Sequence, residues 1–402
     1  MSYLEFLLFW LFLLFRGIVG IGEASYSNIC PSMISDMFTG SARSRMFMLF
    51  YFAVPVGSGL GFVVGSTVAS YMGAWQWGIR LTAVAGIIAL ALLIVIVDEP
   101  QRGAAEKSDD RLPSKSGSYW KDVKTLMRTP TFISCTWAYT TLIFVTGTLS
   151  WWEPTIIKHA VAWNQGLNDT ELLPNYKKDQ IGQIFGGITT VAGIIGVSAG
   201  TILSETLLKG QGIFRPLKTE RAQPLVSGLG SLIAAPLLLL GFLFDSLKLW
   251  CVRFISDLCL QILLFFVVTF LSFNWSLNVD VLMSVVLPSM RSTAFSYFML
   301  ISHLFGDASG PYIIGAISDA IRGDVKTPKT QYISLVKASA VTVVLLCISA
   351  VLYFVTSVTL PKDQAKFRKQ LGLTDCDRKE TDSSSSSNEK LNRIYIDESE
   401  QV

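Results

Sequence analysis

Charge is scarce in this chain of 402 residues. Only 16% of its residues are charged, whereas an ordinary soluble domain carries about 25%. The Lys and Arg residues form no basic stripe, and they gather between apolar segments, which argues against nucleic-acid binding. Apolar residues make up 51% of the sequence, and the mean hydropathy is +0.47. These values exclude an ordinary soluble domain and indicate a membrane protein.

Metal-binding and catalytic patterns are also lacking. The chain has two histidines, His159 and His303, and six scattered cysteines without CxxC spacing, so it offers no metal-ligand cluster and no disulfide framework. No GxSxG, HExxH or Walker motif occurs. We therefore expect neither an enzyme nor a bound metal or cofactor.

Long apolar segments dominate what is present. A membrane-spanning helix needs about 20 largely apolar residues. The first apolar run lacks a positive n-region and an A-x-A cleavage site, so we interpret it as a spanning helix and not as a signal peptide. The sequence predicts an all-α polytopic membrane bundle with nine spans, at 4–36, 46–70, 76–97, 130–152, 179–204, 224–246, 249–276, 292–320 and 331–360.

Basic residues divide and orient the predicted bundle. A Lys- and Arg-rich loop at 98–129 separates a partial N-terminal bundle of three spans (1–97) from a six-helix bundle (130–360), and a Ser- and charge-rich tail (361–402) is predicted to be disordered. The positive-inside rule places this loop and the tail on the cytoplasmic side. Asn168, in an Asn-Asp-Thr sequon on the opposite side, is then a candidate for glycosylation.

The first span carries two opposite charges. Arg16 and Glu23 are seven residues apart and therefore share one helix face, with Tyr26 one turn further along. Either the two charges form an ion pair that fixes helix packing, or they line a water-filled cavity. In the second case Arg16 would bind a phosphate, Glu23 would exchange protons, and all three residues would contact substrate.

Three further patterns bear on movement and coupling. Gly57, Gly61 and Gly65 recur every four residues after Pro55, which indicates close helix packing or a transport role with a kink. His303 and Asp307 share a face, so they form either a proton relay or a structural pair. Gly310 and Pro311 are expected to act as a hinge.

Asp280 is expected near water at the inner end of its span, where it would cap or gate.

Several motifs resemble the Spinster family of the major facilitator superfamily. They lie in order along the chain, at Arg16–Phe38, Phe50–Ser66, Glu99–Gly103, Asn274–Ser276, Pro288–Thr293 and Ser302–Gly315. In the twelve-helix fold that the resemblance implies, the first span here matches the fourth helix, and the first three helices have no counterpart. The Gly-Asp-Arg loop of the family is absent with them.

The resemblance implies a membrane-embedded secondary transporter that works by alternating access. Its substrate would be a lysophospholipid or a sphingoid phosphate such as sphingosine-1-phosphate, with proton coupling. The late endosomal or lysosomal membrane is the expected location, with the plasma membrane as the alternative. A second hypothesis is a non-transporting isoform that binds or regulates a full-length membrane partner.

Overall fold

A computed structural model describes residues 3–74, 76–96, 119–210, 212–247 and 253–370, and these residues contain helices and no strand. The N-terminal part comprises α1 (Tyr3–Met37), α2 (Gly40–Tyr51), α3 (Ala53–Met72) and α4 (Gln76–Ile96). The remaining elements are α5 (Tyr119–Leu126), α6 (Pro130–Asn164), η2 (Thr170–Leu172), α7 (Asn175–Lys209), η3 (Gly212–Leu217), α8 (Ala222–Leu247), α9 (Arg253–Ser272), α10 (Asn274–Met283), η4 (Pro288–Met290), α11 (Arg291–Ser302), η5 (His303–Asp307), α12 (Ser309–Arg322) and α13 (Pro328–Gln370).

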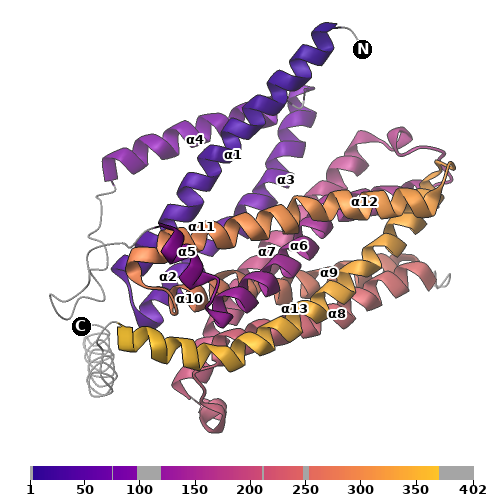
Figure 1. The fold of residues 1–402 in the computed structure, drawn as a ribbon. Helices are drawn as coiled ribbons and strands as arrows, with labels where there is room; N and C mark the ends of the chain where they lie inside the picture. The colour runs from indigo at the N-terminus through magenta and orange to yellow at the C-terminus, as the bar shows by residue number, and fades with distance from the viewer. Residues whose placement is uncertain (1–2, 75, 97–118, 211, 248–252, 371–402) are drawn as a thin grey trace, which may run out of the picture.

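Eight stretches of helix are long and apolar enough to cross a membrane, which confirms the polytopic all-α fold. The predicted span 292–320 corresponds to α11, η5 and α12, which follow one another with a π-helical turn between them. We use "inner end" for the end of the bundle at which α1 and α13 finish and α5 lies (Figure 1). This is the side on which the Lys and Arg pattern places the cytoplasm.

The helices continue beyond the predicted spans. The span predicted at 130–152 belongs to α6, which extends to Asn164, and α13 extends to Gln370 where a disordered tail was predicted from 361. Hydropathy marks the apolar part of a helix and not its end, because a helix can continue into water. At the inner end Asp363 accepts a hydrogen bond from the Thr131 backbone N–H at 3.0 Å, and Phe367 is buried. Residues 371–402 of the predicted tail, and 98–118 of the predicted loop, lie outside the described residues.

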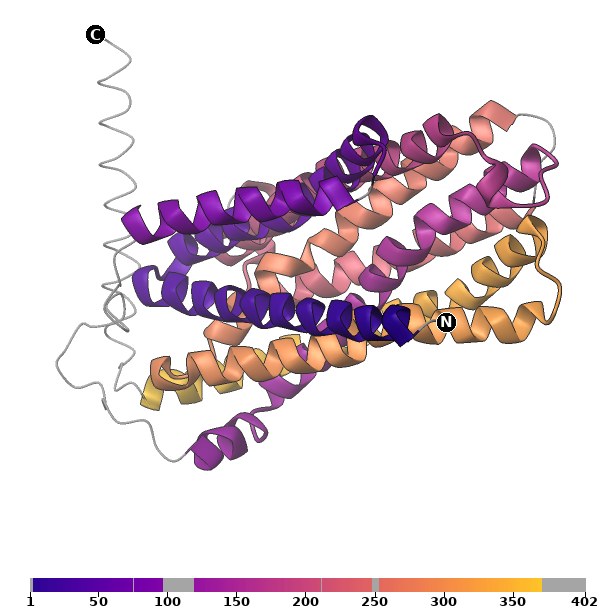
Figure 2. The ribbon, with the colours of Figure 1, turned by 90° about the horizontal axis from the view of Figure 1, so that it is seen from above.

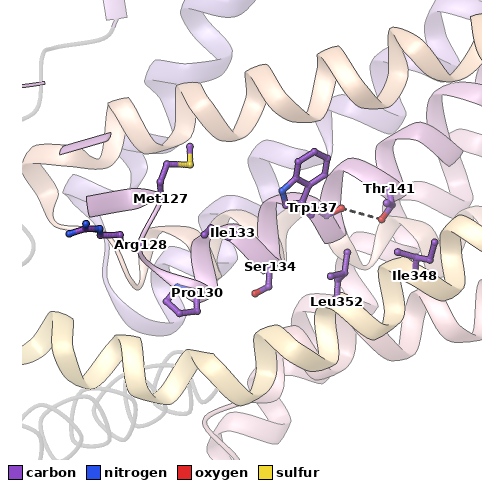
Figure 3. A pocket seen from close by; sticks show the side chains of 9 residues that line it. All are labelled: Met127, Arg128, Pro130, Ile133, Ser134, Trp137, Thr141, Ile348 and Leu352. Atoms are coloured by element: carbon purple, nitrogen blue, oxygen red, sulfur yellow. Dashed lines mark hydrogen bonds between the residues drawn. The ribbon is translucent and has the colours of Figure 1, made fainter. Parts of the chain in front are cut away.

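Buried side chains concentrate in the helices from α6 onward. α6 packs along α13, and hydroxyl pairs join the two helices, with Thr131 to Thr359 at 2.9 Å and Thr356 to Ser134 at 2.8 Å. Such pairs satisfy polar groups where no water is available. On the surface beside this contact, α6 and α13 leave an apolar groove near the inner end (Figure 3).

The N-terminal helices α1 and α4 are largely unpacked within this chain. Every residue of α1 from Leu8 to Tyr26 is exposed, and no residue of α4 is buried. Both helices lie at one edge of the molecule, and α1 diverges from α11 and α12 toward its N-terminus (Figure 1). Figure 2 views the molecule from this edge. The last turns of α1 do pack, since Pro31 and Ser35 are buried.

The close glycine contact of α3 involves a different residue from those predicted. A Cβ on Gly57, Gly61 or Gly65 would meet open space, whereas a Cβ on Gly59 would overlap Thr190 and lie 2.6 Å from the Gly186 carbonyl oxygen of α7. A recurring spacing of four identifies a smooth helix face, and it does not say which neighbour that face meets. Pro55 likewise packs on Gly193 of α7, close to the start of α3.

We expect Gly59→Val to lower the stability of the protein by about 1–3 kcal/mol, because the contact is with backbone and cannot relax easily. Gly57→Val introduces the same residue into the same helix and meets open space, so it serves as the control. Thermal unfolding of the purified variants in detergent is the measurement. Equal shifts for the two variants would contradict the α3–α7 contact.

Candidate functional site

A π turn interrupts the helix formed by α11 and α12 and carries two ionisable side chains. His303 Nδ1 lies 3.0 and 2.9 Å from the two carboxylate oxygens of Asp307, and the side chains are 51% and 40% exposed. The predicted pair is therefore brought together on one face. Single π turns are rare and occur frequently at functional sites.

Contacts with α6 hold the π turn in place. A Cβ on Gly147 of α6 would lie 2.7 Å from Asp307 Cα, and a Cβ on Gly306 would lie 2.8 Å from Ile143 Cγ2. Trp152 of α6 donates a hydrogen bond to the Pro311 carbonyl at 2.9 Å. Small residues thus let the two helices approach closely.

Gly310 and Pro311 lie in the first turn of α12, directly after the π turn. A Cβ on Gly310 would lie 2.8 Å from Thr148 Oγ1 of α6. The structure therefore places the predicted hinge where the regular α-helix is already interrupted, with Gly310 packed against α6.

One of the two charges of α1, Glu23, lies near the π turn. Glu23 is near enough to His303 and to Tyr26 to interact with both electrostatically. Arg16, two turns away on the same face, forms no ion pair with Glu23, and both side chains are exposed. The predicted packing ion pair between Arg16 and Glu23 is therefore not formed. We call Arg16, Glu23, Tyr26, His303 and Asp307 the α1–η5 site.

Aromatic side chains form a buried cluster on the inner side of the π turn. Tyr139 of α6 stacks on Phe298 of α11 with ring centroids 4.8 Å apart, and Phe298 contacts Phe295 at 5.8 Å. Phe47 and Tyr51 of α2 are buried in the same cluster. Helices from both parts of the chain therefore meet in one apolar layer.

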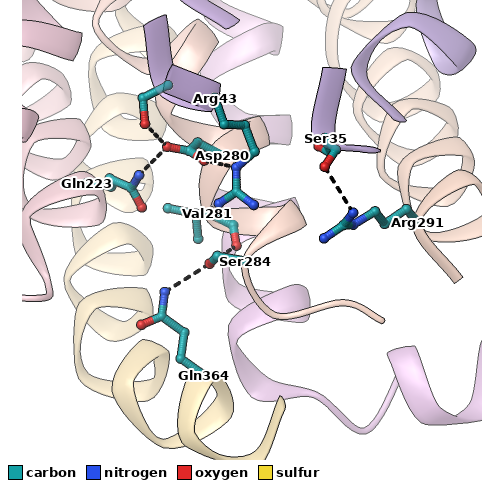
Figure 4. A network of polar contacts seen from close by, with 9 residues as sticks. Ser35, Arg43, Gln223, Asp280, Val281, Ser284, Arg291 and Gln364 are labelled. Atoms are coloured by element: carbon teal, nitrogen blue, oxygen red, sulfur yellow. Dashed lines mark hydrogen bonds and ion pairs between the residues drawn. The ribbon is translucent and has the colours of Figure 1, made fainter. Parts of the chain in front are cut away.

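A buried carboxylate joins α2 to the C-terminal helices beyond this layer. Asp280 of α10 is 2% exposed and lies 2.7 Å from Arg43 Nε (Figure 4). It also accepts hydrogen bonds from Ser44 and from Gln223 of α8. The prediction that Asp280 lies close to water was wrong, because α2 and α8 cover it.

A second ion pair lies beside the first. Arg291, at the start of α11, is 1% exposed, and its Nη1 lies 3.2 Å from an Asp36 carboxylate oxygen. The same Nη1 donates to the Ser35 carbonyl oxygen at 3.2 Å (Figure 4). We call the pairs Arg43–Asp280 and Asp36–Arg291 the inner latch. Asp36 lies in the last turn of α1 and Arg43 in the first turn of α2, so the two pairs join adjoining helix ends to helices far along the chain.

Sequence reasoning missed this latch. Arg43 and Arg291 served only as positive charges that orient the bundle, and no role was predicted for Asp36 or Gln223. The one local signal was a carboxylate, Asp280, within an apolar segment, which implies a partner without naming it.

The other predicted residues lie outside the α1–η5 site. Asn168 is exposed in the connection after α6, beside Asp169, whose side chain accepts a hydrogen bond from the Glu171 backbone N–H. Among the described residues, no group of three or more metal-ligating side chains occurs.

Comparison with known proteins identifies the family. Residues 3–311 match the model of the Major Facilitator Superfamily. The chain belongs to this superfamily. Its similarity to Spinster proteins, expected from the motifs, is confirmed. It is 40% identical over 366 residues to Protein spinster homolog 1 of Xenopus tropicalis. The aligned region covers 89% of this chain and 65% of that protein.

One more curated protein and one solved structure are similar to this chain. The sphingosine-1-phosphate transporter SPNS2 of Mus musculus is 35% identical over 364 residues, covering 90% of this chain and 63% of that protein. A crystal structure of a bacterial homolog of the human lysosomal transporter Spinster, inward-facing and occupied, matches with a TM-score of 0.53 at 21% identity, covering 87% of this chain and 77% of that one. The chain thus spans about two thirds of the length of these curated relatives.

Removing one charge of the inner latch should destabilise the protein. We expect Asp280→Asn to lower stability by about 3–5 kcal/mol, because Arg43 is left without its counter-charge in a buried place. The double variant Arg43→Gln/Asp280→Asn, which has neither charge, should recover part of the loss. Thermal unfolding in detergent measures both.

Asp319→Asn is the matched control for this comparison. Asp319 pairs with Arg322 within α12 and is 67% exposed, and exposed pairs contribute about 0–1 kcal/mol. Equal decreases in stability for Asp280→Asn and Asp319→Asn would show that the latch is not energetically coupled. A double variant whose decrease in stability is the sum of those of its two single variants would show the same.

Proposed function

We propose that the protein is a secondary active transporter of lysophospholipids or sphingoid phosphates that works by alternating access. The observation that carries the proposal is the α1–η5 site. Arg16 and Glu23 lie on a membrane-spanning helix, and Glu23 is within electrostatic range of His303, which pairs with Asp307. Charges within a spanning helix are rare and usually face a cavity that binds substrate or ions. The mouse relative is a sphingosine-1-phosphate transporter by name, which supports this substrate class.

The proposed substrate contacts follow from chemistry. The guanidinium of Arg16 can bind a phosphate through two parallel hydrogen bonds. Tyr26 is 58% exposed on the same helix and offers a hydroxyl to a head group and a ring face to its chain. The apolar side chains around them, among them Ile18 and Val19, suit an acyl or sphingoid chain.

The inner latch gives alternating access a physical basis. With both latch ion pairs formed, the aromatic layer would close the site toward the inner end and leave it open on the α1 side. In the opposite state the latch would separate and the bundles would rock around the site. Substrate and protons would bias this equilibrium through their different affinity for the two states.

Proton coupling would act through Glu23, His303 and Asp307. The carboxylate of Asp307 already accepts a hydrogen bond from His303 in one tautomer, and Glu23 lies within electrostatic reach of the same imidazole. Protonating Glu23 would change the charge that a phosphate meets beside Arg16. We further propose a late endosomal or lysosomal membrane as the location, with the plasma membrane as the alternative.

A second function is favoured by the unpacked N-terminal helices. Leu8–Tyr26 of α1 and nearly all of α4 expose apolar side chains, and in a membrane such faces can pack against other helices. The chain would then bind a full-length membrane partner and regulate it without transporting. Lipid flux by the purified chain alone in vesicles would contradict this alternative.

Arg16→Gln should reduce the flux of a lysophospholipid or of sphingosine-1-phosphate into proteoliposomes by about tenfold to a hundredfold, since it removes a charge-assisted hydrogen bond of about 1.5–3 kcal/mol. Arg16→Lys should recover only part of the flux, because Lys cannot form the bidentate contact. Arg80→Gln is the control, because Arg80 lies over the Trp77 ring of α4 with 4.6 Å between its Cζ and the centroid. Unchanged flux in Arg16→Gln would remove Arg16 from the substrate site.

Glu23→Gln should abolish the acceleration of lipid flux by an imposed proton gradient, while exchange without a gradient continues. The amide keeps the size and polarity of the side chain and cannot exchange a proton. Glu171→Gln, at an 84% exposed side chain in the connection after α6, should respond to the gradient as the parent does. A gradient response that survives Glu23→Gln would exclude Glu23 as the coupling group and leave His303 and Asp307 to be tested.

A further inference from the structure

A groove separate from the α1–η5 site runs along the surface of α6 and α13. It has a volume of about 650 Å³ and is walled by apolar side chains of the two helices, among them Ile133, Trp137, Ile348 and Leu352 (Figure 3). Met127 and Arg128, which follow α5, line its inner end. Phe305 of the π turn lies 6.1 Å from Trp137, ring to ring.

The groove has the length of one lipid leaflet. Its α6 residues extend from Pro130 to Thr141, which at 1.5 Å per residue is about 16 Å. The hydrocarbon core of a bilayer is about 30 Å thick, so one leaflet is about 15 Å. Both walls belong to helices that are long and apolar enough to span the membrane, so we infer that acyl chains surround the groove.

The inner end of the groove lies at the level of the membrane surface. The short helix α5 has the composition of an interfacial helix, with Tyr119 and Trp120 52% and 74% exposed, while Lys121 and Lys124 are exposed and Leu126 is buried. Exposed Tyr and Trp side chains gather at lipid head groups. Arg128, two residues after α5, therefore lies where phosphates of the inner leaflet are found.

Arg128 itself has an uncompensated charge. Its side chain is exposed at the end of the groove, and within the described part of the chain no carboxylate forms an ion pair with it. Lys121 and Lys124 add positive charge nearby on α5. An apolar groove that ends in unpaired positive charge is complementary to a lipid with a negative head group.

We propose that this groove binds an anionic phospholipid of the inner leaflet. One acyl chain of the lipid lies against Trp137, and the phosphate of its head group contacts Arg128. The lipid is resident and is not the transported substrate, because the groove lies within the C-terminal helices and is built from none of the α1–η5 residues. It remains in contact with α6 and α13 when the two parts of the transporter move apart at the inner latch.

Photo-crosslinking identifies the occupant. The full chain, with Trp137 replaced by p-benzoylphenylalanine, is reconstituted in vesicles of phosphatidylcholine and phosphatidylglycerol in equal amounts, irradiated and analysed by mass spectrometry. We expect adducts of phosphatidylglycerol in excess over phosphatidylcholine. A crosslink to the chain's own residues 97–118 or 371–402, to a second copy, or to neither lipid would overturn the proposal.

Charge removal tests the head-group contact. Arg128→Gln in the same background should reduce the ratio of phosphatidylglycerol to phosphatidylcholine adducts by about fivefold. Arg221→Gln removes an equally exposed Arg at the inner end outside the groove and should leave the ratio unchanged. A ratio that is unaffected by Arg128→Gln, or lowered equally by both variants, would contradict the role of Arg128.

Discussion

The buried carboxylate of Asp280 constrains how the two parts of this protein can be arranged. A charge that is 2% exposed requires a counter-charge and hydrogen-bond donors, and Asp280 receives them from α2 and α8 at once. Withdrawing α2 would leave a buried charge alone, at a cost of several kcal/mol. The inner end is therefore expected to be either joined with all contacts made or separated far enough for water to reach both charges. Such an all-or-none contact is what alternating access requires.

The exposed charges of α1 depend on this arrangement. The last turns of α1 are held at the inner end through Asp36 and Arg291, and the rest of the helix diverges from α11 and α12. Arg16 and Glu23 are exposed, and Glu23 lies within electrostatic range of His303 in the π turn. The glycines of α6 and η5 fix the position of that turn.

The sequence predicted those features that depend on residues close together in the chain. Apolar length identified the spanning segments, and the spacing of four between His303 and Asp307 placed the two on one face, where they form a pair. The latch could not be predicted, because Arg43 and Asp280 are 237 positions apart and nothing near either residue specifies the other. The choice of Gly59 over Gly57 for the α7 contact has the same cause, since it depends on where a second helix lies. Asp363 at the inner end likewise shows that a charged segment can be ordered by a helix terminus that needs an acceptor.

The distance between spin labels at the inner end tests the central claim most directly. In a background without native cysteines, labels at Arg45 of α2 and Thr125 of α5, both exposed, report the inner end. Labels at Leu8 of α1 and Ile321 of α12, also exposed, report the opposite end. The latch account predicts that Asp280→Asn lengthens or broadens the inner distance and shortens the outer one in lipid vesicles. Inner and outer distance distributions identical to those of the parent protein would contradict the account.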